Sequence, residues 1–415
     1  MGLGGILNYV CKLAAVAVGS LPCLEAAGET SLDYGLRLRS ANIDVVKNSA
    51  ESLSAKVRLT LSHEFTEQSS ALLQVDHIET FLDNRHSTAL LANDNPLVLD
   101  TPATEINQLL LSHQWDEYGL TLGRQVIEFD AERFVGDIDF WQNDRTFDGI
   151  SLNAALWSGS RLAYAYVYNV NRIFGDDAGS RLDPQDIRFD ELDGRRPAGQ
   201  WGDHRVDGHF LHLKVKEWDY VELSGYGFAV HNYDQVANSN RTLGLRSKFR
   251  YKPELLQYTG IVELARQQKQ TSDVTAWIPY YLLEAGFEYR GLELNLRREY
   301  LGQKSGEAFI TPLGSRHEFQ GWADLFNVTP VEGVDDRSIR LNWRQRPWQI
   351  DLRLHRFYTT KNTTAIGDEI NLDLIYKPHR KHEVKIRFAD YRPESGQTIA
   401  PDRTKGLFIS YSYNL

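Results

Sequence analysis

The chain has 415 residues, with 46 Lys and Arg against 56 Asp and Glu and a net charge of −10. Hydrophobic residues at 42% and charged residues at 25% exclude a disordered chain. No apolar run is long enough for a membrane-spanning helix, and the acidic balance argues against a nucleic-acid partner, which requires a basic face. No linker rich in Pro, Gly or Ser divides the chain into two domains.

The first residues have the pattern of a secretion signal. An apolar stretch over residues 13–24 follows Lys12 and ends in small residues. We therefore expect a signal peptide over residues 1–27 and a single mature domain over residues 28–415. Both cysteines, Cys11 and Cys23, fall in the signal, so the mature chain needs neither a disulfide nor a thiolate metal site. A lipoprotein signal and a buried N-terminal helix are the disfavoured alternatives.

Beyond residue 30, apolar and polar residues alternate with period two, which is typical of half-buried β-strands. Between 338 and 355, for example, Ile339 and Leu341 share one face and Arg340 and Asn342 the other. Eighteen such segments follow one another along the chain. They begin near Leu32, Leu53, Ser70, Glu105, Tyr118, Phe147, Ser160, Gly208, Tyr220, Asn240, Glu254, Ile278, Gly291, Asp336, Pro347, Gly367, Lys381 and Thr404.

The connections between these segments alternate in length. Short links such as 116–117 and 346–347 are followed by long ones, of which 128–146, 173–207 and 301–335 are among the largest. This alternation predicts an all-β transmembrane antiparallel barrel of about 18 strands, with short periplasmic turns and long extracellular loops. Lipid offers no hydrogen bonds to an open sheet edge, so the sheet must close. We therefore expect an integral protein of the bacterial outer membrane in contact with its lipid.

The faces opposite the lipid-facing residues would line a lumen, and they are rich in cations. Arg outnumbers Lys, 32 to 14, and the planar fork of Arg grips carboxylates and phosphates. Rings of Arg or Lys make anion pores. Predicted lumen cations are Arg37, Arg39, Lys56, Arg58, Arg246, Lys248, Arg250, Arg297, Arg340, Arg344, Arg346, Arg353, Lys385 and Arg387. The alternative is a mixed ladder in which these cations pair with Asp and Glu across strands and bind nothing.

Two long connections, over 123–149 and 311–330, combine aromatic and charged residues. Aromatic residues in such number would be sticky outside, so we expect both loops to fold into the barrel and narrow it. The candidate solute contacts in these loops are Arg124, Arg133, Asn143, Arg145, Arg316 and His317. The strand residues that we expect to join them on the pathway are Arg246, Arg250, Arg297, Arg340, Arg344 and Arg353.

The same loops resemble those of the alginate export family of outer-membrane proteins, in the segment 123–149 and in the run His317-Glu318-Phe319-Gln320-Gly321-Trp322-Ala323-Asp324. The resemblance implies a monomeric 18-stranded barrel whose electropositive constriction passes an anionic polysaccharide. It adds weight to Arg124, Arg133, Asn143, Arg145 and His317, and it adds Trp322 to the pathway. The expected function is passive passage of anionic solutes, among them acidic poly- or oligosaccharides such as alginate. The alternative is a non-conducting barrel that acts as a surface receptor or scaffold.

Other chemistry has weaker support. The acidic segment 176–193 lacks the spacing of a calcium loop, and His63-Glu64 and His317-Glu318 lack the second His of a zinc hydrolase. Ser112 and His113 alternate to opposite faces, which disfavours a barrel hydrolase. We therefore expect no enzyme activity, no cofactor and no metal.

Overall fold

The computed structural model describes residues 28–82, 85–90, 93–179, 197–270 and 276–415. The expected signal peptide and most of the acidic segment 176–193 lie outside these residues. No helix among the described residues is long and apolar enough to cross a membrane.

The described chain forms one 18-stranded antiparallel sheet and one two-stranded hairpin. The barrel strands are β1 (Glu29–Val45), β2 (Asn48–Thr66), β3 (Ser69–Thr80), β4 (Ala103–Trp115), β5 (Tyr118–Gln125), β6 (Thr146–Ala155), β7 (Arg161–Asn171), β8 (Asp203–Val215), β9 (Val221–Asn232), β10 (Asn240–Tyr251), β11 (Leu256–Lys269), β12 (Ile278–Tyr289), β13 (Leu292–Leu301), β16 (Val334–Gln345), β17 (Trp348–Tyr358), β18 (Ala365–His379), β19 (His382–Pro393) and β20 (Thr404–Tyr413). The hairpin is β14 (Gln303–Lys304) with β15 (Glu307–Ala308).

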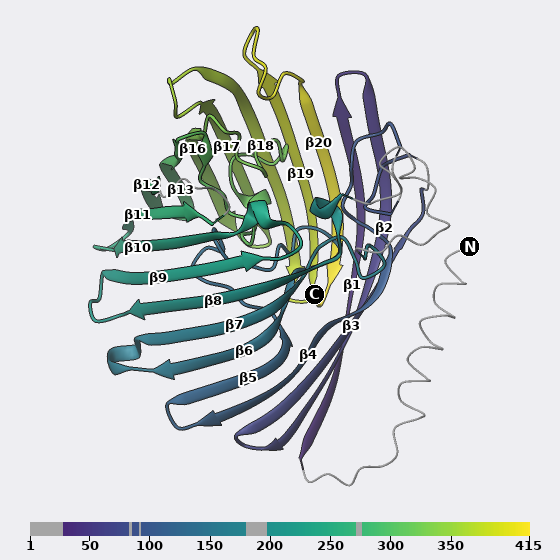
Figure 1. The fold of residues 1–415 in the computed structure, drawn as a ribbon, viewed down its shortest axis with the longest axis vertical. Helices are drawn as coiled ribbons and strands as arrows, with labels where there is room; N and C mark the ends of the chain where they lie inside the picture. Colours follow the sequence, from purple (N-terminus) through teal and green to yellow (C-terminus); the bar gives the residue numbers. More distant parts are fainter. Residues whose placement is uncertain (1–27, 83–84, 91–92, 180–196, 271–275) are drawn as a thin grey trace.

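Each strand pairs with its neighbour in sequence, and the sheet closes because β1 pairs with β20 as well as with β2 (Figure 1). The closing register sets Leu36 opposite Tyr413 and Val45 opposite Thr404. The predicted barrel and its 18 strands are confirmed. The predicted strand starts also agree to within five residues, the largest differences being at β2 and β8, which begin at Asn48 and Asp203.

The outer wall of the barrel is apolar and the interior is polar, the reverse of a soluble protein. Outward side chains are well exposed, for example Leu245 (68%), Leu264 (56%), Leu296 (58%) and Ile339 (46%). Adjacent inward residues such as Glu263, Asn295 and Asn342 are buried. Rows of exposed Leu and Ile on consecutive strands suit hydrocarbon, and a closed sheet leaves no backbone edge in it. The barrel therefore spans a membrane.

The two ends of the barrel differ. At one end tight turns join the strands, for instance at 116–117, 290–291 and 346–347, and exposed aromatics such as Trp115 and Tyr118 surround it. The longest described connections, 126–145 and 302–333, lie at the other end. The link between β1 and β2 is an exception, since only residues 46–47 connect them at the end with the long loops. This is the architecture of an integral outer-membrane barrel with periplasmic turns and extracellular loops.

Candidate functional site

The connections 126–145 and 302–333 fold into the lumen, as their aromatic content predicts. We call them the first and second inward loops. They pair with each other, because the amide of Gly136 donates to the carbonyl of Leu313 over 3.0 Å and that of Ser315 to the carbonyl of Glu132 over 2.9 Å. Trp141 of the first loop and Trp322 of the second are 4% and 1% exposed. The barrel is therefore narrowed by its own loops.

Gly321 shows why the turn in the second inward loop requires glycine. Its φ is +83°, a conformation that L side chains rarely adopt. A Cβ atom there would also lie 2.3 Å from Oε2 of Glu369 on β18. The close approach allows that carboxylate to accept the backbone N–H of Ala323 at 2.9 Å, which anchors the loop to the wall.

One half of the lumen is filled by an apolar cluster. Phe134 of the first inward loop packs against Tyr226 of β9, Tyr280 of β12 and Phe309, with ring centroids 5.2–5.8 Å apart. Phe129 stacks on His212 of β8 with centroids 4.9 Å apart. Tight packing of large rings excludes water. The loop thus closes the side of the lumen next to β8, β9 and β12.

Arg133 fixes the first inward loop to this closed half. Its Nε donates to Oε1 of Glu299 on β13 over 2.5 Å, and its two terminal nitrogens donate to Thr311 and Gln320 over 3.0 and 2.8 Å. Glu299 is fully buried, and Arg297 also donates to it. Arg133 therefore joins both inward loops to the wall through a desolvated ion pair.

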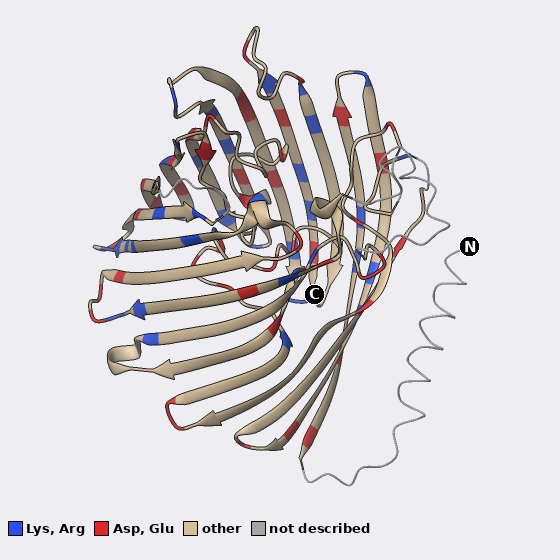
Figure 2. Ribbon diagram, viewed as in Figure 1, with Lys and Arg blue, Asp and Glu red and all other residues tan. Residues whose placement is uncertain are grey.

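The opposite half stays open around a cavity of about 750 Å³. The strands β1, β2, β19 and β20 and the turn after β18 line it. Nine lining side chains are basic: Arg37, Arg39, Lys56, Arg58, Lys377, Arg380, Lys381, Lys385 and Arg387. Five are acidic: Asp137, Asp139, Asp144, Glu318 and Glu383. Figure 2 shows the charges gathered on β1, β2 and β16–β20, whereas β5–β7 carry few.

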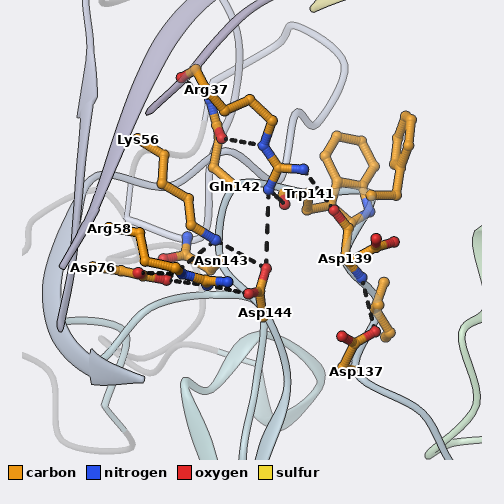
Figure 3. A network of polar contacts seen from close by, with 12 residues as sticks. Arg37, Lys56, Arg58, Asp76, Asp137, Asp139, Trp141, Gln142, Asn143 and Asp144 are labelled. Carbon is orange, nitrogen blue, oxygen red and sulfur yellow. Dashed lines mark hydrogen bonds and ion pairs between the residues drawn. The ribbon is translucent and has the colours of Figure 1, made fainter. Parts of the chain in front are cut away.

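The carboxylate of Asp144, at the end of the first inward loop, organises the wall formed by β1 and β2 (Figure 3). Lys56 Nζ lies 3.0 Å from it and 3.1 Å from Asp76 of β3. Arg58 donates to both carboxylates, and Arg37 Nη2 lies 4.0 Å from Asp144. Three cations thus share two carboxylates. These cations lower the pKa of Asp144 well below its usual range, although burial acts to raise it.

Arg37 makes its closest contacts with uncharged acceptors. Its guanidinium donates to the carbonyls of Asp139 and Trp141 over 2.7 and 2.8 Å and to the side-chain amide oxygen of Gln142 over 3.0 Å. Hydrogen bonds to neutral oxygens hold the side chain without cancelling its charge. Arg380 and Lys381, in the turn after β18, have no acid within 4.0 Å among the described residues. The positive charge at this wall is therefore only partly neutralised.

Arg387 of β19 faces the second inward loop. It donates to Asp373 over 2.7 and 2.8 Å and to Glu318 over 3.2 Å, and its guanidinium lies 3.9 Å from the ring centre of Trp322. Burial acts to raise the pKa of Glu318, but the opposite effect of Arg387 and Arg353 is larger. The pKa is therefore lowered, and this carboxyl stays ionised. An aromatic face and two acids thus fix the orientation of the guanidinium.

A group of three acids lies on the first inward loop. Glu128, Glu132 and Asp137 each bring a carboxylate oxygen within 4.8 Å of the others, which is the spacing of a possible cation site. Burial is the main cause that raises the pKa of Asp137 to about 8, and neighbouring acids, Asp139 first, raise it further. Protonation of Asp137 near neutral pH thus reduces the repulsion among the three acids, and no bound cation is needed for this.

The loop residues expected to contact solute mostly hold the loops in place. Arg124 pairs with Asp148 at 2.8 Å, and Arg316 donates to the carbonyl of Asn327. Asn143 donates to the carbonyl of Thr101, and Arg145 donates to the carbonyls of Gly136, Pro312 and Gly314. His317 contacts Asp324 at 2.9 Å and stacks on Phe140, while Trp322 packs under Arg387 and Arg353.

The strand arginines expected on the pathway pair mostly across strands. Arg246 contacts Glu263 at 2.5 Å, Arg297 contacts Glu284 and Glu299, Arg340 and Arg353 share Asp351, and Arg344 contacts Glu293. Arg250 lies exposed towards the periplasmic end of β10. None of the thirteen expected pathway residues lines the 750 Å³ cavity, although His317, Trp322 and Arg353 contact side chains that do. The alternative of a mixed ladder, in which lumen cations pair with acids across strands, therefore applies to the part of the lumen formed by β10–β17.

Six of the nine cations that line the cavity lie on the lumen face that the sequence predicts, although it does not single them out. They form pairs two residues apart: Arg37 with Arg39, Lys56 with Arg58, and Lys385 with Arg387. Barrel closure brings β19, β20, β1 and β2 side by side. Basic pairs at this spacing on strands that closure makes neighbours are the signal that identifies this wall.

Comparison with known proteins supports the fold. No family model matches the chain, and no curated protein matches it. Among solved structures it is similar to OccAB4 of Acinetobacter baumannii, with a TM-score of 0.68 and 11% identity over 92% of this chain and 98% of that one. OccAB2 of the same organism has a TM-score of 0.68 and 15% identity, over 93% of this chain and 98% of that one. OpdK of Pseudomonas aeruginosa, solved with vanillate, has a TM-score of 0.66 and 10% identity, over 93% of this chain and 98% of that one.

These matches correct one expectation from the sequence. The resemblance to the alginate export family is wrong, because the similar structures are porins of the Occ type and no family model matches. The two stretches that suggested it are the inward loops. Their conspicuous residues are accounted for by contacts within the lumen: Arg133 with Glu299, His317 with Asp324, and Trp322 with Arg387. The fold defines the protein as an 18-stranded outer-membrane barrel.

Proposed function

We propose that the protein is a passive channel for small anionic solutes, which cross the outer membrane along the wall formed by β19, β20, β1 and β2. One observation carries the proposal: the open half of the lumen has nine basic lining residues, against five acidic lining residues and three buried acids behind them that pair with lining cations, Asp76, Asp100 and Asp373. Rings of Arg and Lys favour anions in pores. The apolar cluster occupies the lumen next to β8, β9 and β12, and the cavity beside Phe129 is smaller, about 290 Å³, so we expect a solute to follow the basic wall.

The chemistry of the wall favours carboxylates. Arg37 and Arg387 are held by fixed acceptors or a ring face, so each presents its guanidinium in a defined orientation. A planar guanidinium donates two parallel hydrogen bonds to a carboxylate. OpdK, whose fold is similar, was solved with vanillate, which is a carboxylate anion. We infer a carboxylate of this size class or a small acidic saccharide as solute.

The inward loops favour small solutes over a polymer. The cavity of about 750 Å³ is in the range that encloses a drug-sized molecule. No cofactor or energy source takes part, and the solute gradient sets the direction of flow.

A flux assay in liposomes tests the proposal. The purified barrel should pass glucuronate faster than glucose, because the two sugars have similar size and differ in a carboxylate. Arg37→Gln should reduce the glucuronate flux more than the glucose flux, and Arg37→Lys should restore part of it. Arg161→Gln is a control on the closed half, at the start of β7, and should leave both fluxes unchanged. Equal fluxes of the two sugars would refute anion preference, and no flux of either would favour a receptor or scaffold.

A further inference from the structure

Two arginines share one aspartate on the outer wall of the barrel. Arg298 of β13 donates to both oxygens of Asp335 over 2.8 and 2.9 Å, and Arg337 of β16 donates to Oδ2 over 2.9 and 3.2 Å. The Asp335 side chain is 3% exposed, whereas those of Arg298 and Arg337 are 43% and 42% exposed. The buried carboxylate thus orients two exposed guanidiniums and cancels only one of their charges.

The same arrangement recurs on the far side of β17 and β18. Arg392 of β19 and Arg403, just before β20, both donate to Asp390, with distances of 2.8–3.2 Å. The Asp390 side chain is 7% exposed, and those of the two arginines are 61% and 46% exposed. We call the two sets the Asp335 and Asp390 triplets. Each carries one uncompensated positive charge.

Aromatic rings hold the Asp335 triplet in place. The guanidinium of Arg337 lies 4.4 Å from the ring centre of Tyr358, and that of Arg298 lies 5.5 Å from Tyr281. Tyr281 in turn stacks on Tyr300, with ring centroids 4.7 Å apart. Because the aromatic faces restrict both guanidiniums, less conformational entropy is lost when they bind a further group. Between the triplets, Arg356 pairs with Asp368 and Glu394, so this middle group carries one net negative charge and separates the two positively charged triplets.

Both triplets lie at the upper edge of the apolar wall. Arg298 follows outward-facing Leu296 along β13, and Arg337 precedes outward-facing Ile339 along β16, and these two apolar residues are 58% and 46% exposed. Phe388 precedes Asp390 by two residues in β19, and its cross-strand partner Leu407 is 37% exposed. The triplets share the end of the barrel with the long loops, which is the extracellular end. They therefore face the headgroup layer of the outer leaflet.

We propose that the two triplets bind phosphate groups of the phosphorylated glycolipid of the outer leaflet, lipopolysaccharide. Each guanidinium has five N–H donors and uses part of them on its aspartate, and a pair of guanidiniums is a good match for a phosphate. The apolar rows directly below would contact the acyl chains of the same lipid. A soluble partner would have to enter the lipid to reach both the rows and the triplets.

Binding of purified lipopolysaccharide to the purified full-length barrel in detergent tests the proposal. The triple variant Arg298→Gln, Asp335→Asn, Arg337→Gln removes the Asp335 triplet without leaving a lone buried charge. It should bind lipopolysaccharide about tenfold more weakly than wild type, because it loses a pair of charge-assisted hydrogen bonds to phosphate. A second variant, Arg298→Lys with Arg337→Lys, keeps the charge and loses the fork, so it should recover only part of the affinity. Heat-modifiable migration on gels checks that each variant folds.

The matched control is the outward pair of Arg205 with Asp234 beside β8 and β9, where one arginine faces one carboxylate. Arg205→Gln with Asp234→Asn should leave binding unchanged. Lipopolysaccharide stripped of phosphate should bind wild type and the triple variant alike, and inorganic phosphate alone should compete weakly. Equal loss in the control variant, or an equal affinity of wild type for intact and stripped lipid, would overturn the proposal and leave the triplets as structural ion pairs.

Discussion

Lys56 Nζ of β2 lies 3.0 Å from Oδ1 of Asp144, and this pair joins the first inward loop to the basic wall. The Lys56 side chain is fully buried and that of Asp144 is 6% exposed. Breaking such a pair leaves a charge without a partner in a poorly hydrated place. The contact therefore couples the position of the loop to the charge of the open half of the lumen.

Asp144→Asn should make the channel more selective for anions. The substitution removes one of the two carboxylates that Arg37, Lys56 and Arg58 share, so the net charge of the wall rises by one. Asn keeps the size of the side chain and one acceptor for Lys56. Reversal potentials of single channels in a KCl gradient measure the change. An unchanged or reduced anion preference would contradict the assignment of this wall as the pathway.

Arg133→Gln should release the inward loops while the barrel remains closed. Glu299 would lose one of its two arginine partners in a fully buried place, a loss of about 3–5 kcal/mol for a buried pair. We expect faster proteolysis within 302–333 and noisier single-channel currents. Arg250→Gln, at an exposed position on β10, is the control and should behave as wild type. Unchanged proteolysis would show that Arg133 does not hold the loops.

Anion selectivity should fall as the pH rises from 7 to 9. Asp137 lines the cavity, and its pKa is raised to about 8, first by burial and then by neighbouring acids. An acid with this pKa is about one-tenth ionised at pH 7 and about nine-tenths at pH 9, so the rise in pH adds negative charge to the cavity. The groups around it are Asp139, Asp144, Glu132, Glu128 and Arg145.

Asp137→Asn separates this effect from other titrations. The variant should keep its pH 7 selectivity up to pH 9, measured as the reversal potential at each pH. If wild type and variant lose selectivity alike, another group titrates in this range.

Arg380→Gln with Lys381→Gln should slow the entry of anions from the periplasmic side. Both residues line the cavity in the turn after β18, and unpaired charges at a pore mouth raise the local concentration of counter-ions. The effect should be largest at low ionic strength and small near 1 M salt, where the Debye length is about 3 Å. Lys252→Gln, in a different periplasmic turn, should have no effect. A loss of conductance that does not depend on salt would indicate a structural defect instead.

Much of the fold could be predicted because the alternation of apolar and polar residues is a local property. The face of Leu296 or Ile339 follows from its neighbours in sequence, and lipid outside and water inside make that pattern strict. Barrel closure then follows from the need to satisfy every edge. Inward folding of the two loops also followed from their own composition.

The open, basic half of the lumen could not be predicted in the same way. Which arginines are neutralised depends on partners far away in sequence, as with Arg133 and Glu299, 166 residues apart. The sequence also gives no sign that Phe134 and Tyr280 close one half of the barrel. The choice of Arg246, Arg340 and Arg344 as pathway residues rested on strand faces. The mixed ladder was the alternative, and the sequence alone could not say which arginines pair with acids such as Glu263, Asp351 and Glu293.

The ion selectivity of the purified barrel tests the central claim most directly. In a planar bilayer with a KCl gradient at moderate salt, chloride should carry most of the current, and Arg37→Gln should shift the reversal potential towards that of a non-selective pore. A current carried mainly by potassium, or a reversal potential that Arg37→Gln leaves unchanged, would contradict the assignment of β19, β20, β1 and β2 as an anion pathway.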